Sequence, residues 1–518
     1  MNLPDKKHSI ECTSHIVEDA LLSMITKSGA KALPFQLKAA TDAAIKLQTQ
    51  QGILLQAHAG LGKTYIIMPV IKYLLENKLI EMQSDWPMPI LWVTPAAVIP
   101  QTQEVINQFK LTAKIFPVSY AAFRGKLMED LYWKKYKHPT YETYTYAWKA
   151  SRLPSLVVFD ECQGLKNDTS SQTQIAWSIP KGVKRIFVSA TPYQKVSEAR
   201  SVVQGVGMKY GELPCTEDNI TELLRDIALH SHPSSLCQAS MTRLRKRMED
   251  YAVFVPKVRY KFKTHTRCRL IEFETAEERQ QYDSYYEAFL AKCREMDRNT
   301  HFGWNEMLVA MQKFREGAEL VRAPRMAKRA IDTVEQGRQT IVVCNFVEPM
   351  RKVYTELVKL GLSKDRIAFI IGGQTPTKRE AQRQLFQTGK ADIMLFTMRS
   401  GGVGISLHHD TEQGKPRHII IPPTWSAIDL VQALGRGHRI TSISDTTQDV
   451  VWYKDTIEEK VCARVEAKLD CINASVGARE NWVNVFTNGT VQQDVATKDE
   501  YQDIEEENLN VIQDNETK

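Results

Sequence analysis

Short apolar runs recur along the first part of the chain, and stretches with helical periodicity lie between them. An apolar run of this length, bounded by polar residues, is typical of a buried strand. Strands that alternate with helices predict a parallel sheet covered on both faces. The runs lie at 53–55, 89–94, 116–120, 156–159 and 185–188.

The same alternation returns after Gly337, with apolar runs at 340–344, 368–371, 393–396 and 418–421. Long charged helical stretches, among them 275–292 and 304–316, dominate the region between the two parts. The pattern predicts an α/β fold with two parallel-sheet lobes. We expect an N-terminal extension (1–30), a first lobe (31–205), a helical connector (206–325), a second lobe (326–480) and an acidic disordered tail (481–518).

The apolar run Ile53–Leu55 leads into a glycine-containing loop that ends in Gly60-Leu61-Gly62-Lys63-Thr64, and a helical pattern follows. Backbone N–H groups at the start of such a helix point at a bound anion, and the helix dipole favours negative charge there. Glycines let the backbone approach the phosphates. The loop therefore predicts a nucleotide site in which Lys63 contacts the β- and γ-phosphates and Thr64 ligates Mg²⁺.

A carboxylate pair, Asp160-Glu161, follows the apolar run 156–159. Polar groups at the carboxyl ends of parallel strands meet at one edge of the sheet. We expect Asp160 to help hold Mg²⁺ and Glu161 to orient and deprotonate the attacking water.

Two arginines, Arg436 and Arg439, lie in the second predicted lobe within the string QALGRGHR. We expect this string at the start of a helix, where residues three apart share a face. An inserted arginine stabilises the charge that develops during phosphoryl transfer. The spacing therefore predicts an ATP site completed across two lobes.

This ordered set of motifs resembles the superfamily 2 helicases and translocases, which have two RecA-like lobes. Several strings are similar to those of its Swi/Snf-type branch, which tracks along duplex DNA: DECQGLKN (160–167), SATPYQK (189–195), SGGVGISL (400–407), QALGRGHR with Trp425 seven residues before it, and DTIEEK (455–460). The resemblance covers about residues 33 to 470. One departure is Gln163, where that branch has histidine.

The resemblance implies further site residues. Gln36 would recognise adenine, Gly404 and Gln432 would contact the nucleotide, and Gln163, Ser189 and Thr191 would couple hydrolysis to movement. Thr94, Ser400 and Gly402 would line the nucleic-acid track. The implied cofactors are ATP and Mg²⁺.

The net charge of +7 is unevenly distributed. Residues 492–518 contain nine carboxylates and two lysines, a net −7, so the rest of the chain carries +14. A basic body suits a polyanionic partner. The tail could mimic DNA against this body, or have no role.

Residues 126–149 mix basic and aromatic side chains, which can bind nucleic acid. An ordinary helix and loop surface is nevertheless the favoured interpretation of this segment.

The nine cysteines show no zinc-ligand spacing. No secretory signal and no apolar run long enough for a membrane span is found, so we expect an intracellular protein without membrane contact.

The expected function is an ATP-dependent translocase or helicase that moves on DNA, with duplex favoured. Three alternatives remain: an RNA helicase of the same superfamily, a transcription- or repair-associated ATPase that does not separate strands, and a scaffold that binds ATP without hydrolysing it. The intact set of Lys63, Asp160, Glu161, Arg436 and Arg439 argues against the scaffold.

Overall fold

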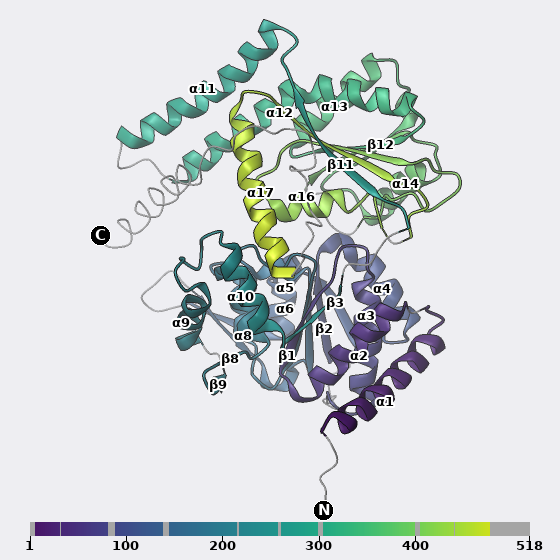
Figure 1. Cartoon of the computed structure of the whole chain (residues 1–518), viewed down its shortest axis with the longest axis vertical. Helices are drawn as coiled ribbons and strands as arrows, with labels where there is room; N and C mark the ends of the chain where they lie inside the picture. Colours follow the sequence, from purple (N-terminus) through teal and green to yellow (C-terminus); the bar gives the residue numbers. More distant parts are fainter. Residues whose placement is uncertain are drawn as a thin grey trace, which may run out of the picture.

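The computed structural model shows two α/β lobes, one above the other in Figure 1. It describes residues 6–31, 33–80, 89–137, 144–214, 217–256, 261–298, 304–398, 405–439 and 441–476. Each lobe has a six-stranded sheet in which all neighbouring strands are parallel. The predicted fold of two parallel-sheet lobes is therefore confirmed.

The first sheet has the strand order β10-β1-β7-β6-β2-β3. Its strands are β1 (Gly52–Gln56), β2 (Ile90–Thr94), β3 (Ile115–Ser119), β6 (Leu156–Asp160), β7 (Lys184–Ser189) and β10 (Ala252–Phe254). Helices α1 (Lys6–Lys27), α2 (Pro34–Thr49), α3 (Lys63–Glu76) and α4 (Ile99–Gln108) pack on one face. The other face carries α5 (Tyr120–Phe123), α6 (Lys126–Leu131), α7 (Ser171–Trp177), α8 (Arg200–Gly205), α9 (Glu217–Ala228) and α10 (Gln238–Met248).

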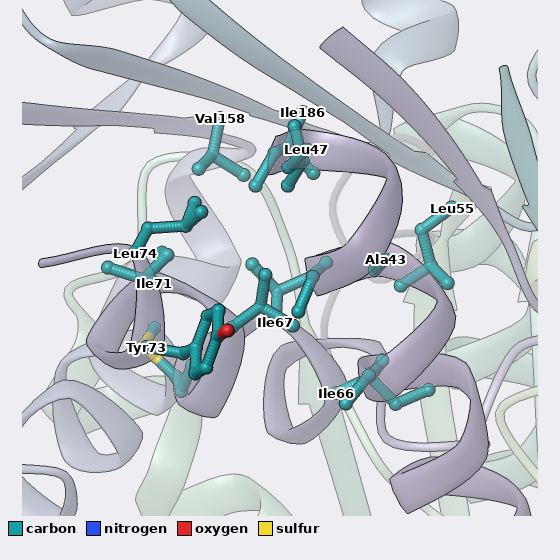
Figure 2. Packing of buried hydrophobic residues seen from close by; sticks show 14 of the residues in the cluster. Ala43, Leu47, Leu55, Ile66, Ile67, Ile71, Tyr73, Leu74, Val158 and Ile186 are labelled. Atoms are coloured by element: carbon teal, nitrogen blue, oxygen red, sulfur yellow. The ribbon is translucent and has the colours of Figure 1, made fainter. Parts of the chain in front are cut away.

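The core beneath the nucleotide loop is shown in Figure 2. Ile67 and Ile71 of α3 project toward Leu47 of α2 and toward Val158 and Ile186 of the sheet, and all five are fully buried. Burying an aliphatic side chain of this size contributes about 1.5–3 kcal/mol. This packing fixes the helix that begins at Lys63 against the strands that carry the acidic pair.

The second sheet has the order β11-β16-β15-β12-β14-β13. Its strands are β11 (Thr264–Ile271), β12 (Gln339–Cys344), β13 (Ile367–Ile370), β14 (Ile393–Thr397), β15 (Arg417–Ile421) and β16 (Thr446–Tyr453). Helices α12 (Trp304–Glu335) and α13 (Val347–Lys359) cover one face, and α14 (Pro376–Gln387), α16 (Ala427–Leu434) and α17 (Ile457–Val476) cover the other. Helices α11 (Ala276–Arg298) and α12 pair and extend from this lobe (Figure 1).

The segment 206–325 is not a separate helical connector. Helices α9 and α10 pack on the first lobe and β10 joins its sheet, whereas β11 is an edge strand of the second sheet. The first lobe therefore extends to Phe254 at least, and the second lobe already includes Thr264. Helix α17 then reaches back to the first lobe: Cys471 belongs to that lobe's core, and Arg245 of α10 donates to the Ser475 carbonyl at 3.4 Å.

The region before residue 31 also belongs to the first lobe, because Val17, Leu21, Met24 and Ile25 of α1 are part of its core. Residues 126–149 were expected to be helix and loop. They contain α6 and an antiparallel hairpin of β4 (Trp133–Lys137) and β5 (Tyr144–Trp148). A second small hairpin pairs β8 (Lys209–Tyr210) with β9 (Leu213–Pro214).

The acidic tail lies outside the described residues. Among the residues that the structure describes, no helix is long and apolar enough to cross a membrane.

Candidate active site between the lobes

The loop after β1 has the backbone that a phosphate site requires. Gly60 and Gly62 have φ angles of +84° and +73°, a region that side chains disfavour. A Cβ at Gly62 would also lie 2.6 Å from Gln36 Nε2. Helix α3 begins at Lys63, so Lys63 and Thr64 stand in its first turn, where the backbone N–H groups have no partner within the helix.

Gln36 is held against this loop. Its Nε2 donates to the Leu61 carbonyl at 2.9 Å, and its Oε1 accepts from the Leu33 backbone N–H at 3.0 Å. The residue that the resemblance implied as the adenine contact is thus adjacent to the loop.

Asp160 is the last residue of β6 and is buried, with 5% of its surface exposed. The Thr94 hydroxyl donates to its Oδ2 at 2.9 Å, and the Tyr120 hydroxyl donates to its backbone carbonyl at 3.0 Å. Burial and the neighbouring Glu161 raise the pKa of Asp160 to about 6, although Lys63 acts in the opposite direction. A bound cation would offset this cost of burying a carboxylate.

Glu161 lies at the centre of the polar contacts. Its Oε1 is 3.6 Å from Lys63 Nζ, and its Oε2 accepts from Gln163 Nε2 at 2.9 Å. Gln163 in turn accepts from the Ser189 hydroxyl at 2.7 Å, and Ser189 Oγ accepts from the Thr191 N–H at 3.0 Å. The three residues expected to couple hydrolysis to movement therefore form one hydrogen-bonded chain to Glu161.

The second lobe reaches the same carboxylate. Gln432 Nε2 donates to Glu161 Oε2 at 3.4 Å. Arg439 lies against the phosphate loop, because a Cβ added to Gly60 would meet its Cγ at 3.1 Å. One site is thus shared by Gln432 and Arg439 of the second lobe and by Gly60 and Glu161 of the first, which are far apart in sequence.

The expected helical placement of the arginines is wrong. Helix α16 ends at Leu434 with Gly435 as its C-cap, so Arg436 and Arg439 lie in the turn after a helix rather than on the face of one. Arg436 is buried and its Nη1 donates to the Ile405 carbonyl at 3.3 Å. Burial, and then the charge of Arg439, lower its pKa to about 9, while Glu161 opposes that shift.

Thr94 requires a second correction. Its side chain is fully buried and bonded to Asp160, so it supports the acidic pair and has no surface to offer nucleic acid. Ser400, Gly402 and Gly404 lie outside the described residues.

Tyr120 was not predicted from the sequence. Its hydroxyl donates to the carbonyls of both Asp160 and Glu161, and its ring occupies the space beside Gly164, where a Cβ would approach to 3.0 Å. No local pattern around Tyr120 marks this role, since the partner residues are about forty positions away.

Comparison with known proteins finds similarity to helicases. The family model "Helicase conserved C-terminal domain" matches residues 323–441. A protein of Acanthamoeba polyphaga mimivirus, provisionally named ATP-dependent RNA helicase L364, is 23% identical over 492 residues, which cover 87% of this chain and 85% of the viral protein.

Two vertebrate relatives match in part. The zebrafish (Danio rerio) chromodomain-helicase-DNA-binding protein 1-like is 22% identical over 84% of this chain, and the chain spans 43% of its length. The zebrafish DNA excision repair protein ERCC-6-like is 34% identical over 115 residues, 21% of this chain and 7% of that protein. These matches support the resemblance to the Swi/Snf-like branch of helicase superfamily 2.

Among solved structures, the chain is similar to the Sulfolobus solfataricus SWI2/SNF2 ATPase core in complex with dsDNA. The TM-score is 0.34 at 16% identity, covering 88% of this chain and 94% of that one. The C-terminal part of the Fun30 ATPase domain gives a TM-score of 0.30 over 39% of this chain. The helicase-type relatives support a nucleic-acid-dependent ATPase that uses ATP, typically with Mg²⁺.

The residues of this site fit ATP and Mg²⁺. The first turn of α3 offers unpaired N–H groups and a lysine to the phosphates. Thr64 and the buried Asp160 supply the hard oxygen ligands that Mg²⁺ prefers. Bound Mg²⁺ would neutralise phosphate charge.

Proposed function

We propose that the chain is an ATP-dependent translocase that moves on duplex DNA. The observation that carries the proposal is the convergence of both lobes on Glu161, through Lys63 from the first lobe and Gln432 from the second. A site shared between two bodies lets ATP binding and hydrolysis change their separation. Repeated opening and closing on a bound strand would produce movement.

Each group has a defined part in the proposed reaction. Lys63 and the α3 N–H groups bind the phosphates, and Glu161 takes the proton from water. Arg436 and Arg439 stabilise the negative charge that spreads over the transferred phosphoryl group. The chain Glu161–Gln163–Ser189 connects the reacting end of the site to the loop after β7.

Duplex DNA is favoured by the Swi/Snf-type strings DECQGLKN and SGGVGISL. The names of two vertebrate relatives also refer to DNA binding and DNA repair. Binding would be held mainly by phosphate contacts and would weaken steeply with salt.

The test is ATP turnover by the full chain titrated with duplex DNA, single-stranded DNA and RNA, together with displacement of a triplex-forming strand from a duplex. We expect the strongest stimulation by duplex and ATP-dependent triplex displacement. Stimulation without displacement would contradict translocation.

An RNA helicase is the second candidate, because the viral relative that spans most of this chain carries that name. Stimulation by RNA above duplex DNA, with unwinding of an RNA duplex, would favour it over the DNA translocase.

A further inference from the structure

A second site lies at the opposite edge of the first sheet from the nucleotide loop. A cavity of about 710 Å³ opens between the β4–β5 hairpin, α7, α8 and the amino ends of β1 and β7. The nucleotide loop follows the carboxyl end of β1, which at about 3.3 Å per residue is roughly 16 Å away. The two sites are therefore separate.

The hairpin that forms one wall is firmly anchored at its base. Trp133 is buried and donates from Nε1 to the Phe123 carbonyl at 3.3 Å. Trp148 donates from Nε1 to Ser178 Oγ at 3.1 Å, which ties β5 to the end of α7. Strand β5 is thus held in place beside the cavity, which its residues Tyr144, Thr145 and Tyr146 line.

Beyond the base, the hairpin exposes basic and aromatic side chains. Lys134, Lys135 and Lys137 are exposed, and the exposed fractions of Tyr136 and Tyr144 are 51% and 40%. Lys135 Nζ lies 3.5 Å from the centre of the Tyr144 ring. Exposed aromatic rings and neighbouring cations are the groups that stack on bases and contact phosphates in single-strand binding sites.

The cavity itself is cationic. Its lining includes Lys181 and Arg185, and no described lining residue is an aspartate or glutamate. Arg185 is 5% exposed; its Nη1 and Nη2 donate to backbone carbonyls near the ends of α8 and α7, but its Nε is buried without a partner. Gln204 Oε1, which also lines the cavity, is buried and unpartnered. Buried polar groups are normally bonded, so these two atoms leave unused hydrogen-bonding capacity in the wall of the cavity.

We propose that this cavity and the β4–β5 hairpin bind single-stranded nucleic acid, with the tyrosines stacking on bases and Lys181 and Arg185 attracting the phosphates. The proposal rests on the proposed function and extends it, since the preferred DNA would have an unpaired strand next to the duplex on which the lobes act. Stacking requires unpaired bases, so an uninterrupted duplex would not fill this site.

The test uses the full chain with the double substitution Tyr144→Ala and Lys181→Ala, both at exposed side chains. The matched control is Tyr285→Ala with Lys292→Ala on α11, where the tyrosine is 38% exposed. Affinity is measured for a fluorescent dT₁₂ strand, for dTMP, and for a blunt duplex with and without a dT₁₂ overhang. Ultraviolet cross-linking of dT₁₂ followed by peptide mapping locates the strand.

We expect the double variant to bind dT₁₂ about tenfold more weakly and to lose the preference for the overhang, with unchanged turnover on blunt duplex. The control should match the wild type, and cross-links should map to 144–148 or 171–181. Unchanged dT₁₂ affinity in the double variant, cross-links confined to other regions, or dTMP binding as tightly as dT₁₂ would each overturn the proposal.

The two proposals fail differently. Turnover stimulated by blunt duplex, with no cross-link to the hairpin, would leave the translocase in place and remove the second site. Cross-links to the hairpin without any stimulation of turnover by nucleic acid would leave the second site in place and remove the translocase.

Discussion

Glu161 has a backbone φ of +52°, in the left-handed region that residues with side chains seldom adopt. Such strain costs about 1–3 kcal/mol and persists where surrounding contacts enforce it. The Tyr120 hydroxyl, Lys63 and Gln163 supply those contacts. The turn directs the Glu161 side chain at Lys63, whereas Asp160, the residue before it, remains in the sheet.

Lys63→Ala tests the proposed phosphate contact. We expect loss of ATP turnover by at least about 10³-fold, because the charge that stabilises the transferred phosphoryl group is removed. Steady-state turnover with saturating DNA measures it, and Lys72→Ala on the same helix should retain activity. Near-normal turnover in Lys63→Ala would remove Lys63 from the mechanism.

Arg436→Ala tests the contribution of the second lobe. The interaction strengthens as charge develops, so kcat should fall by about 10³-fold or more while nucleotide affinity changes little. Binding of a fluorescent ATP analogue and kcat are measured separately, with Arg351→Ala on the exposed face of α13 as control. An effect on KM alone would assign Arg436 to ground-state binding.

At the scale of elements, one buried carboxylate joins three parts of the second lobe. Asp449 of β16 accepts from Arg267 of β11 at 2.9 Å, from Arg329 of α12 at 2.8 Å and bonds to His418 of β15 at 2.9 Å. Burial alone would raise the pKa of Asp449, but His418 and the guanidiniums hold it well below its usual range. The edge strand β11 and helix α12 are thereby fixed to the sheet.

Asp449→Asn should destabilise the second lobe by about 2 kcal/mol, less than for a fully buried pair because the guanidiniums are partly exposed. Since the folded pKa is lowered, this stabilisation is complete above the unfolded pKa of about 3.9 and is lost as pH falls through the folded pKa. Thermal unfolding should therefore show a gap between wild type and variant at pH 7 that narrows toward acid. A gap that is constant with pH would contradict this role for the charge.

At the scale of the whole molecule, the lobes touch at the nucleotide site and again along α17. A Cβ at Gly435, directly after α16, would lie 3.3 Å from Ala59 Cβ of the first lobe. The φ of Gly435 is −67°, so a side chain there would not strain its own backbone. A large side chain at this position would contact Ala59 and hold the two lobes apart without disturbing the fold of either lobe.

Gly435→Leu is therefore expected to lower kcat at least about tenfold, because the lobes could no longer approach each other. Melting temperature and ATP-analogue binding should stay close to wild type. Gly182→Leu, at an open position of the first lobe, is the control. Unchanged kcat in Gly435→Leu would show that closure at this contact is not required.

The sequence alone determined the nucleotide loop and those strands that are continuous apolar runs, because both are signalled locally. A run such as 156–159, apolar on both faces and followed by Asp160-Glu161, is explained best by a buried parallel strand. Lys63-Thr64 after an apolar strand and a glycine-containing loop likewise carries its chemistry within a few residues.

Strand β16 was not predicted from the sequence, because its first half contains the polar residues Thr447, Gln448 and Asp449, which are nevertheless buried. Its burial depends on partners from β11, β15 and α12, which no local pattern shows. The lobe boundary was misplaced for the same reason, since β10 and β11 are too short or too polar to be recognised alone.

Only the tertiary structure decided which side chains meet. It placed Thr94 on Asp160 instead of on the nucleic-acid track, put Arg436 and Arg439 beyond the end of α16, and brought Gln432 to Glu161. Each of these outcomes depends on atoms contributed by segments tens to hundreds of residues apart. Composition and periodicity report what one segment prefers, whereas contacts across a folded chain depend on how all the segments pack together.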